Sequence, residues 1–111
     1  MSRNGSTERI AELNDALRTE GPDRRWVLSS GLFALGTESV MDILREVVTF
    51  DSFTEGNDPY GEHDCAVFEM EGVKIMWKID YYDISREGGS PDPSDPEVTE
   101  RVITVMLASE N

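Results

Sequence analysis

Hydrophobic positions recur at helical spacing in two stretches of the first half of the chain. The first stretch carries Ile10, Leu13, Ala16 and Leu17 on one face. Ser6 or Thr7 is a suitable N-cap, and Gly21-Pro22 ends the pattern because proline cannot continue a helix. We therefore predict an amphipathic helix over about residues 7–20.

A second helical stripe follows and is predicted to lie in the core. Its apolar face carries Val40, Ile43, Leu44, Val47 and Val48. Thr37 is the predicted N-cap of this helix. Between the two helices, the run from Arg25 to Ser29 is β-prone, and Ser30-Gly31 closes it. The first half is therefore predicted to form a helix, a short strand and a second helix.

The pattern changes to a period of two in the second half of the chain. Residues 65–70 and 73–82 alternate between apolar and polar positions, and Glu71-Gly72 joins them, which predicts a β-hairpin. One face of the second strand carries Val73, Ile75, Trp77, Ile79 and Tyr81. The other face carries Lys74, Met76, Lys78, Asp80 and Tyr82. We expect the first of these faces to be buried.

The last segment combines two signals. Asp95-Pro96-Glu97 could begin a helix, but the residues that follow are a dense β-branched cluster. We predict a strand over about residues 101–108, apolar on both faces and therefore central. The fold class is then α+β in one domain, residues 1–111: an antiparallel sheet of about four strands with two amphipathic helices on one face, in the order α-β-α-β-β-β.

Composition adds a strong acidic bias. The 111 residues include 23 Asp and Glu against 10 Lys and Arg, a formal net charge of −13. Residues 51–100 alone hold 14 acidic and 3 basic residues, and loop-like stretches over residues 51–64 and 86–97 carry much of this charge. The balance argues against direct binding to nucleic acid or to an anionic membrane, and it favours a basic partner or a metal.

Cysteine usage and the N-terminal residues bear on the compartment. Cys65 is the single cysteine, so an internal disulfide is excluded. The first eight residues contain no apolar signal core, and no run approaches the length of a membrane span. We therefore expect a cytoplasmic protein in which Cys65 is a small buried residue rather than a nucleophile.

Four motifs, occurring in order, carry a resemblance to a known family. They are Asn57–Asp64 (NDPYGEHD), Trp77–Asp83 (WKIDYYD), Ser90–Pro96 (SPDPSDP) and Arg101–Ala108 (RVITVMLA). Together they resemble the bacterial domain of unknown function 3768 family. The resemblance implies a small cytoplasmic protein of proteobacteria, often encoded on plasmids or prophage-like elements, with no named activity. The sequence departs from the family pattern at Cys65-Ala66, where an aromatic-glycine pair is expected, and at Asn111, where a tyrosine is expected.

The first functional hypothesis is a non-enzymatic acidic interaction protein. Its carboxylates would occupy a basic, nucleic-acid-binding surface of another protein, because duplex DNA also presents closely spaced negative charges. The candidate partner-binding residues are Asp51, Glu55, Asp58, Glu62, Asp92, Asp95, Glu97 and Glu100. The mobile-element association that the resemblance implies would make the partner a host-defence protein. Solvated acidic loops that only aid solubility are the simpler interpretation.

The alternative hypothesis is a metal-dependent hydrolase, in which one ion activates water. The candidate ligands are Asp58, Glu62, His63, Asp64 and Asp80. Oxygen donors with one imidazole suit magnesium, manganese or iron better than zinc. The sequence contains no recognisable catalytic signature, so no catalytic residue is assigned. A simpler interpretation is that His63 hydrogen-bonds a nearby carboxylate and pins the loop.

Overall fold

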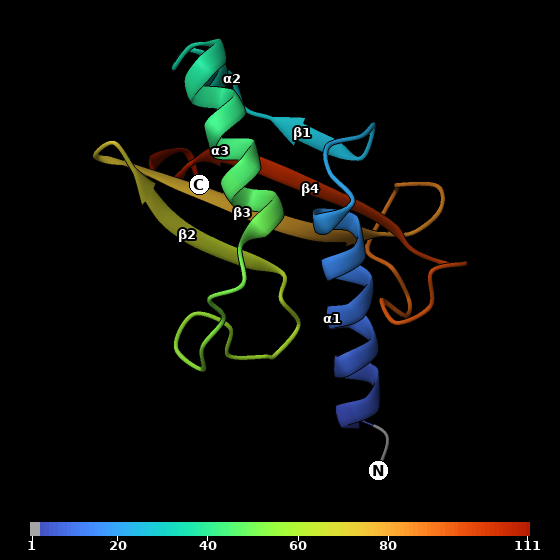
Figure 1. The fold of residues 1–111 in the computed structure, drawn as a ribbon. Helices are drawn as coiled ribbons and strands as arrows, with labels where there is room; N and C mark the ends of the chain where they lie inside the picture. Colours follow the sequence, from blue (N-terminus) through green and yellow to red (C-terminus); the bar gives the residue numbers. More distant parts are fainter. Residues whose placement is uncertain (1–2) are drawn as a thin grey trace.

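A computed structural model of the chain describes residues 3–111 and shows an α+β fold built on a four-stranded sheet (Figure 1). In chain order the elements are α1 (Arg3–Thr19), β1 (Trp26–Leu28), α2 (Ser30–Phe33), α3 (Thr37–Thr49), β2 (Cys65–Met70), β3 (Val73–Tyr82), β4 (Glu100–Leu107) and the 3-10 helix η1 (Ala108–Glu110). The predicted order α-β-α-β-β-β is confirmed, with the short helices α2 and η1 added to it.

The sheet has the strand order β1-β4-β3-β2. The strands β2, β3 and β4 are antiparallel, whereas β1 runs parallel to β4 and aligns Trp26 with Ile103. The predicted antiparallel sheet is therefore mostly correct, and β1 is the exception. Its direction follows from α1, which delivers the chain to the end of the sheet where β4 begins: the Ile103 N–H donates to the Arg25 carbonyl. The predicted central position of the last strand is confirmed.

The β2–β3 turn shows why Glu71-Gly72 joins the hairpin. Met70 pairs with Val73, which leaves a two-residue turn. Both turn residues have positive φ, 54° for Glu71 and 83° for Gly72. This is the backbone of a type I′ turn, which matches the twist of the strands and favours glycine.

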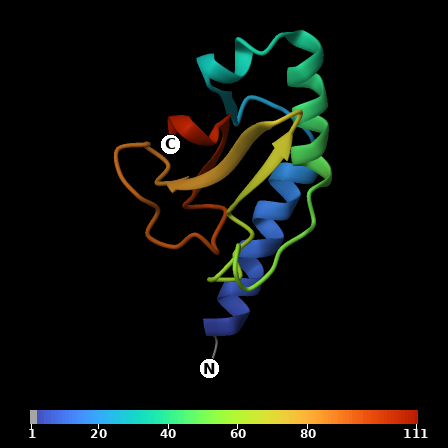
Figure 2. The same cartoon turned by 90° about the vertical axis from the view of Figure 1, so that its left-hand side faces the viewer.

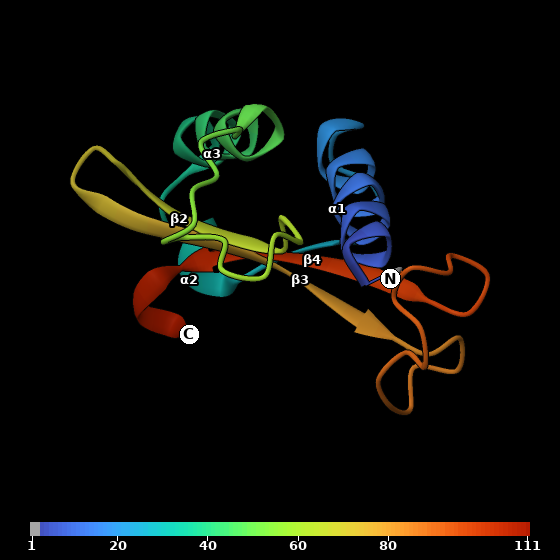
Figure 3. The ribbon, with the colours of Figure 1, turned by 90° about the horizontal axis from the view of Figure 1, so that it is seen from below.

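Both long helices cover the same face of the sheet, as predicted (Figure 3). The same view shows α2 and η1 at the other side of the sheet. The fully buried centre of the core consists of Leu17, Leu32, Ile43, Val47, Ile75, Trp77, Ile103 and Val105. These residues come from the two long helices, from Leu32 of α2 and from the two central strands, so the apolar stripes of the sequence meet in one core.

Two predicted helix starts differ from the structure. Ser6 and Thr7 lie within α1, which begins four residues earlier than expected, and so they do not cap it. The N-cap of α3 is Gly36, with φ 99°, and Thr37 is the first helical residue. Caps are weak local signals, and helix ends shift by one or two residues when tertiary packing continues the turn.

Over residues 3–111, no helix is both long and apolar enough to cross a membrane.

Residues 30–31 begin α2 rather than simply closing β1. The Ser29 hydroxyl accepts a hydrogen bond from the Leu32 N–H at 3.1 Å and caps this short helix. The carboxylate of Glu110 accepts from the Ser29 hydroxyl at 2.6 Å and from the Gly31 N–H at 3.2 Å. Glu110 of η1 thus holds α2 in place, through contacts between residues 79 and 81 positions apart in the sequence.

Candidate functional site

The two acidic segments lie at one end of the sheet. Residues 51–64 lead into β2, and residues 83–99 connect β3 to β4. Because these three strands are antiparallel, the start of β2, the end of β3 and the start of β4 share one end. Figure 2 shows both segments away from the β2–β3 turn. Residues 51–64 contain five acidic residues and no Lys or Arg, and residues 83–99 contain five acidic residues and one arginine.

Four of the eight predicted partner-binding carboxylates are exposed, three are partly exposed, and Asp58 is buried. The exposed residues are Asp51, Glu55, Asp92 and Glu97, and the partly exposed ones are Glu62, Asp95 and Glu100. Glu100 lies 3.5 Å from Arg86 in an ion pair at the surface. Asp51, Glu55 and Glu97 have no side-chain hydrogen bond or ion pair with any residue of the described range. These three are free to meet a partner.

Two carboxylates of the predicted surface, Asp58 and Glu62, have internal partners. Asp58 is only 9% exposed, and its Oδ1 accepts from the His63 N–H at 3.1 Å. Glu62 Oε1 accepts from the Tyr81 hydroxyl at 2.8 Å. Burial raises the pKa of Tyr81, and the phenol therefore keeps the proton that it donates to Glu62. Both residues hold the loop in place, Asp58 as a buried carboxylate and Glu62 as a partly exposed one that is engaged by Tyr81.

His63 links the first acidic segment to α1. Its ring stacks on Phe53 with centroids 4.0 Å apart. Its Nδ1 lies 3.0 Å from Asp15 Oδ1, and its Nε2 lies 3.5 Å from Asp58 Oδ2. The backbone of His63 is in the left-handed region, with φ 55°. The interpretation of His63 as the residue that pins the loop to a carboxylate fits this geometry, and the main carboxylate, Asp15, comes from a helix 48 residues away in sequence.

A buried polar network joins both acidic segments. Asn14 is completely buried, and its Nδ2 donates to the Glu62 carbonyl at 2.9 Å and to the Tyr81 hydroxyl at 2.8 Å. Arg101 Nε donates to Asn14 Oδ1 at 2.7 Å, and Arg101 Nη2 donates to the Pro93 carbonyl. The network therefore runs from residue 62 of the first segment through α1 and β4 to residue 93 of the second. It holds the two segments on one rigid base.

Sequence reasoning missed the polar residues of α1 that build this base. Asn14 follows Ile10 by four residues and precedes Leu17 by three, so it lies within the apolar stripe. Arg18 is also buried and donates to the carbonyls of Val47 and Phe50, where it satisfies the C-terminal turn of α3. A polar residue inside an apolar stripe was the available signal for both.

The candidate metal ligands are only partly brought together. Asp58 and His63 are neighbours, Glu62 is engaged by Tyr81, and Asp80 lies on the opposite face of β3 from Tyr81. Among residues 3–111, no three His, Cys, Asp or Glu side chains gather closely enough to hold a metal ion. Burial raises the pKa of Asp64, and Glu62, Asp58 and Asp80 raise it further.

Cys65 is not arranged as a nucleophile. Burial raises the pKa of its thiol, and the carboxylates of Asp64 and Asp58 raise it further. A thiol with a raised pKa holds its proton at neutral pH, whereas an attacking cysteine needs the thiolate. The Cys65 thiol, which is half-buried at the start of β2, is therefore not activated for nucleophilic attack.

The comparisons with known proteins identify one family model. The model is described as Protein of unknown function (DUF3768), and it matches residues 28–110. The match includes both acidic segments and Arg101, and α1 lies outside it. No curated protein and no solved structure matches the chain.

Proposed function

The chain belongs to the DUF3768 family, whose description names no function, and from that premise we propose that it is an acidic interaction protein that binds a basic surface of another protein. The partner of this class is a nucleic-acid-binding protein, whose basic groove would accept carboxylates in place of phosphates. The observation that supports this most is the fixed placement of two acidic segments at one end of the sheet, with Asp51, Glu55 and Glu97 exposed and unpaired.

Local order in the second segment supports the proposal. Asp92 Oδ1 accepts from the Ser94 N–H at 3.1 Å, and Asp95 Oδ1 accepts from the Glu97 N–H at 2.9 Å. The Thr99 hydroxyl lies 2.9 Å from the Asp92 carbonyl and 2.8 Å from the Asp95 carbonyl. A surface that is ordered before binding loses less conformational entropy on association. Carboxylates held on such an ordered segment can complement basic groups that have fixed positions on the partner.

Local order in the first segment has the same effect. Asn57 Oδ1 accepts from the Thr54 N–H at 2.8 Å, and Asn57 Nδ2 donates to the Ser52 carbonyl at 2.9 Å. Asp51 precedes this turn and Glu55 lies within it, and neither side chain hydrogen-bonds to a described residue. The absence of Lys and Arg from residues 51–64 leaves the field of these carboxylates uncompensated within the segment.

The test compares two triple charge reversals with equal net charge. The site variant carries Asp51→Lys, Glu55→Lys and Glu97→Lys. The control carries Glu46→Lys, Glu69→Lys and Glu71→Lys, which are exposed positions outside both acidic segments. A partner recovered with the wild-type chain is purified, and its affinity for each variant is measured by titration at several salt concentrations.

We expect the site variant to lose affinity by about tenfold or more, because each exposed ion pair contributes roughly 0.2–1 kcal/mol and a reversal adds repulsion. The control should lose much less. Duplex DNA should compete for the same partner surface. The affinity of the chain for the partner should fall as the salt concentration rises, because salt screens exposed charges over a distance of about 10 Å at 0.1 M. Equal affinity of both variants, or binding that ignores salt and DNA, would refute the proposal.

A further inference from the structure

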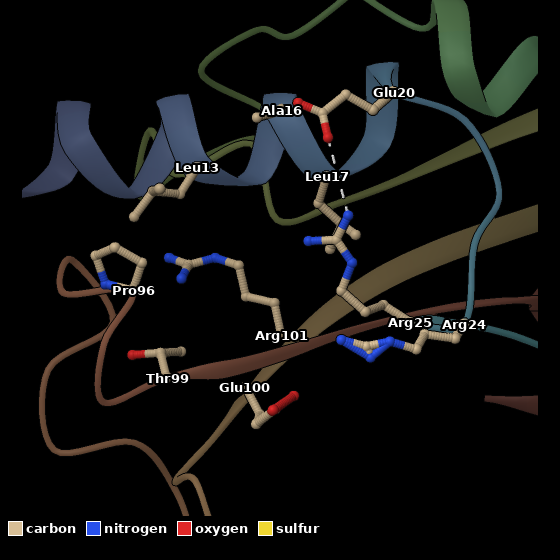
Figure 4. Close-up of a pocket in the computed structure, with 10 residues that line it drawn as sticks. All are labelled: Leu13, Ala16, Leu17, Glu20, Arg24, Arg25, Pro96, Thr99, Glu100 and Arg101. Carbon is tan, nitrogen blue, oxygen red and sulfur yellow. Dashed lines mark ion pairs between the residues drawn. The ribbon is translucent and has the colours of Figure 1, made fainter.

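A pocket of about 340 Å³ lies between α1 and the start of β4 (Figure 4). The α1 side is formed by Leu13, Ala16, Leu17 and Glu20. The chain before β1 contributes Arg24 and Arg25, and the approach to β4 contributes Pro96, Thr99, Glu100 and Arg101. The volume is within the range of about 300–1,000 Å³ that is usual for small-molecule sites. The second acidic segment contributes Pro96 and Thr99 to the lining, and none of its five acidic residues lines the pocket.

Arg101 is the unusual residue of this lining. It is 7% exposed, and its hydrogen-bond partners, Asn14 Oδ1 and the Pro93 carbonyl, are both uncharged. Within residues 3–111, no carboxylate lies within ion-pair distance of Arg101, and its Nη1 has no hydrogen-bond acceptor. Figure 4 shows the guanidinium extending between Leu13 and Pro96. A buried cation without a counter-ion is costly, and burial lowers the pKa of Arg101.

The other charged residues of the lining leave a positive surplus. Both acidic residues have basic partners, since Glu20 lies 3.9 Å from Arg25 and Glu100 lies 3.5 Å from Arg86. Arg25 is held mainly by Asp23, at 2.6 Å. Arg24 is exposed at the pocket and has no ion pair among the residues that the structure describes. The unpaired charges of this pocket are therefore both arginines.

We propose that this pocket binds a small organic anion, whose carboxylate or phosphate accepts hydrogen bonds from Arg101 and whose apolar part lies against Leu13 and Ala16. Guanidinium groups recognise both kinds of oxyanion through paired N–H donors. The bound anion supplies the counter-ion that Arg101 lacks, and Arg24 adds attraction at the rim. Of the eight predicted partner-binding carboxylates only Glu100 lines this pocket, and the pocket takes a ligand of the opposite charge from that partner.

The experiment titrates the full chain with three aromatic probes of similar size. Benzoate carries a carboxylate, phenyl phosphate carries a phosphate, and benzamide has the same ring without a charge. Binding is followed by two-dimensional amide NMR, which reports the location and the Kd together. The variants are Arg101→Met and Arg24→Gln, with Arg45→Gln as the control, because Arg45 is an exposed arginine of α3 outside this pocket.

We expect at least one anionic probe to bind saturably with a Kd of about 1 mM, an ordinary affinity for a ligand of so few atoms. The shifted amides should cluster in residues 13–20, 24–25 and 96–101. The better anion identifies carboxylate or phosphate as the physiological group. Arg101→Met should weaken binding about tenfold or more, and Arg24→Gln about two- to fivefold, because buried charged hydrogen bonds exceed exposed ion pairs.

Three results would overturn the proposal. One is benzamide binding as tightly as benzoate and phenyl phosphate, because the charge would then be irrelevant. Another is equal loss of affinity in Arg24→Gln and Arg45→Gln, which would show general electrostatic attraction. The third is no saturable shift with either anion. Arg24 has no internal partner to lose, so its variant keeps the test valid even where Arg101→Met fails to fold.

Discussion

The two acidic segments have similar compositions but use their polar side chains differently. In residues 51–64, the side chains reach other elements: Glu62 bonds to Tyr81 of β3, and His63 contacts Asp15 of α1. In residues 83–99, Asp83, Asp92 and Asp95 each accept from groups within their own segment. Equal richness in Asp, Glu, Gly and Pro therefore does not predict which carboxylates remain available to a partner.

The difference follows from what each segment lies against. Residues 51–64 pass α1, which offers Asn14, Asp15 and Arg18 on its buried side. Residues 83–99 meet the buried network mainly through the Pro93 carbonyl. The first segment is thus a structural loop with a few free carboxylates, and the second is a surface loop ordered by its own turns. Four experiments test this contrast, in order of decreasing effect.

Asn14→Ala should have the largest effect. It removes the partner of Arg101 Nε, the Tyr81 hydroxyl and the Glu62 carbonyl, so the free energy of unfolding should fall by about 3 kcal/mol. Urea denaturation measures this loss. Hydrogen exchange should accelerate more in residues 51–64 than in residues 83–99. The control, Glu12→Ala on the exposed side of α1, should change stability by less than about 0.5 kcal/mol. A similarly small loss for Asn14→Ala would contradict the network.

The second experiment compares one residue from each segment. His63→Ala removes the stack on Phe53 and the contact with Asp15, and it places alanine at φ 55°. The free energy of unfolding should therefore fall by about 2 kcal/mol. Asp92→Ala removes only the two local hydrogen bonds that Asp92 Oδ1 accepts from the N–H and hydroxyl of Ser94, and it should cost less than about 1 kcal/mol. Both values come from the same urea titration. Equal costs would remove the distinction between the segments.

Two carboxylates with opposite pKa shifts give the third experiment. Burial raises the pKa of Asp64 in the folded state, whereas the bond from Ser85 lowers the pKa of Asp83. A carboxyl with a raised pKa destabilises the fold when ionised, and this penalty disappears as the pH falls through that raised pKa. A carboxyl with a lowered pKa stabilises the fold above its unfolded pKa, and this stability disappears as the pH falls through the lowered value.

Asp64→Asn should therefore raise the melting temperature near neutral pH, and Asp83→Asn should lower it. The difference for Asp64→Asn should shrink as the pH falls through the raised pKa of Asp64, whereas the difference for Asp83→Asn should persist to lower pH and shrink only as the pH falls through the lowered pKa of Asp83. Thermal unfolding followed by circular dichroism across this range measures both trends. Shifts of the same sign in the two variants would show that the segments do not differ in this respect.

Glu97→Gln should have the smallest effect on stability. Its side chain has no internal bond within the described residues, so the change in the free energy of unfolding should stay within about 0.5 kcal/mol. The sign should be slightly favourable because the chain carries a net charge of −13 and repels itself. Urea denaturation again provides the measurement. A marked loss would show that Glu97 has a structural role.

Local sequence patterns predicted the two helices from periodicity, the β2–β3 hairpin from alternation and the Glu71-Gly72 turn, and the central last strand from its β-branched cluster. These features depend on contacts between near neighbours, or on apolar faces whose burial any compact fold requires. The turn at Glu71-Gly72 and the two-faced strand around Ile103 and Val105 are examples. The acidic character of residues 51–64 and 83–99, and their place at one end of the sheet, also follow from the sequence once the hairpin is recognised.

Only the tertiary structure decided the direction of β1 and the role of each carboxylate. Parallel pairing of Trp26 with Ile103 joins residues 77 positions apart, and no local pattern encodes it. Tyr81 donates to the Glu62 carboxylate and Asn14 to its backbone carbonyl, whereas no described residue hydrogen-bonds or ion-pairs with the Glu97 side chain. Arg101 and Asn14 meet across 87 residues. A hydrogen bond needs alignment within a few tenths of an ångström, and only the folded chain sets positions that finely.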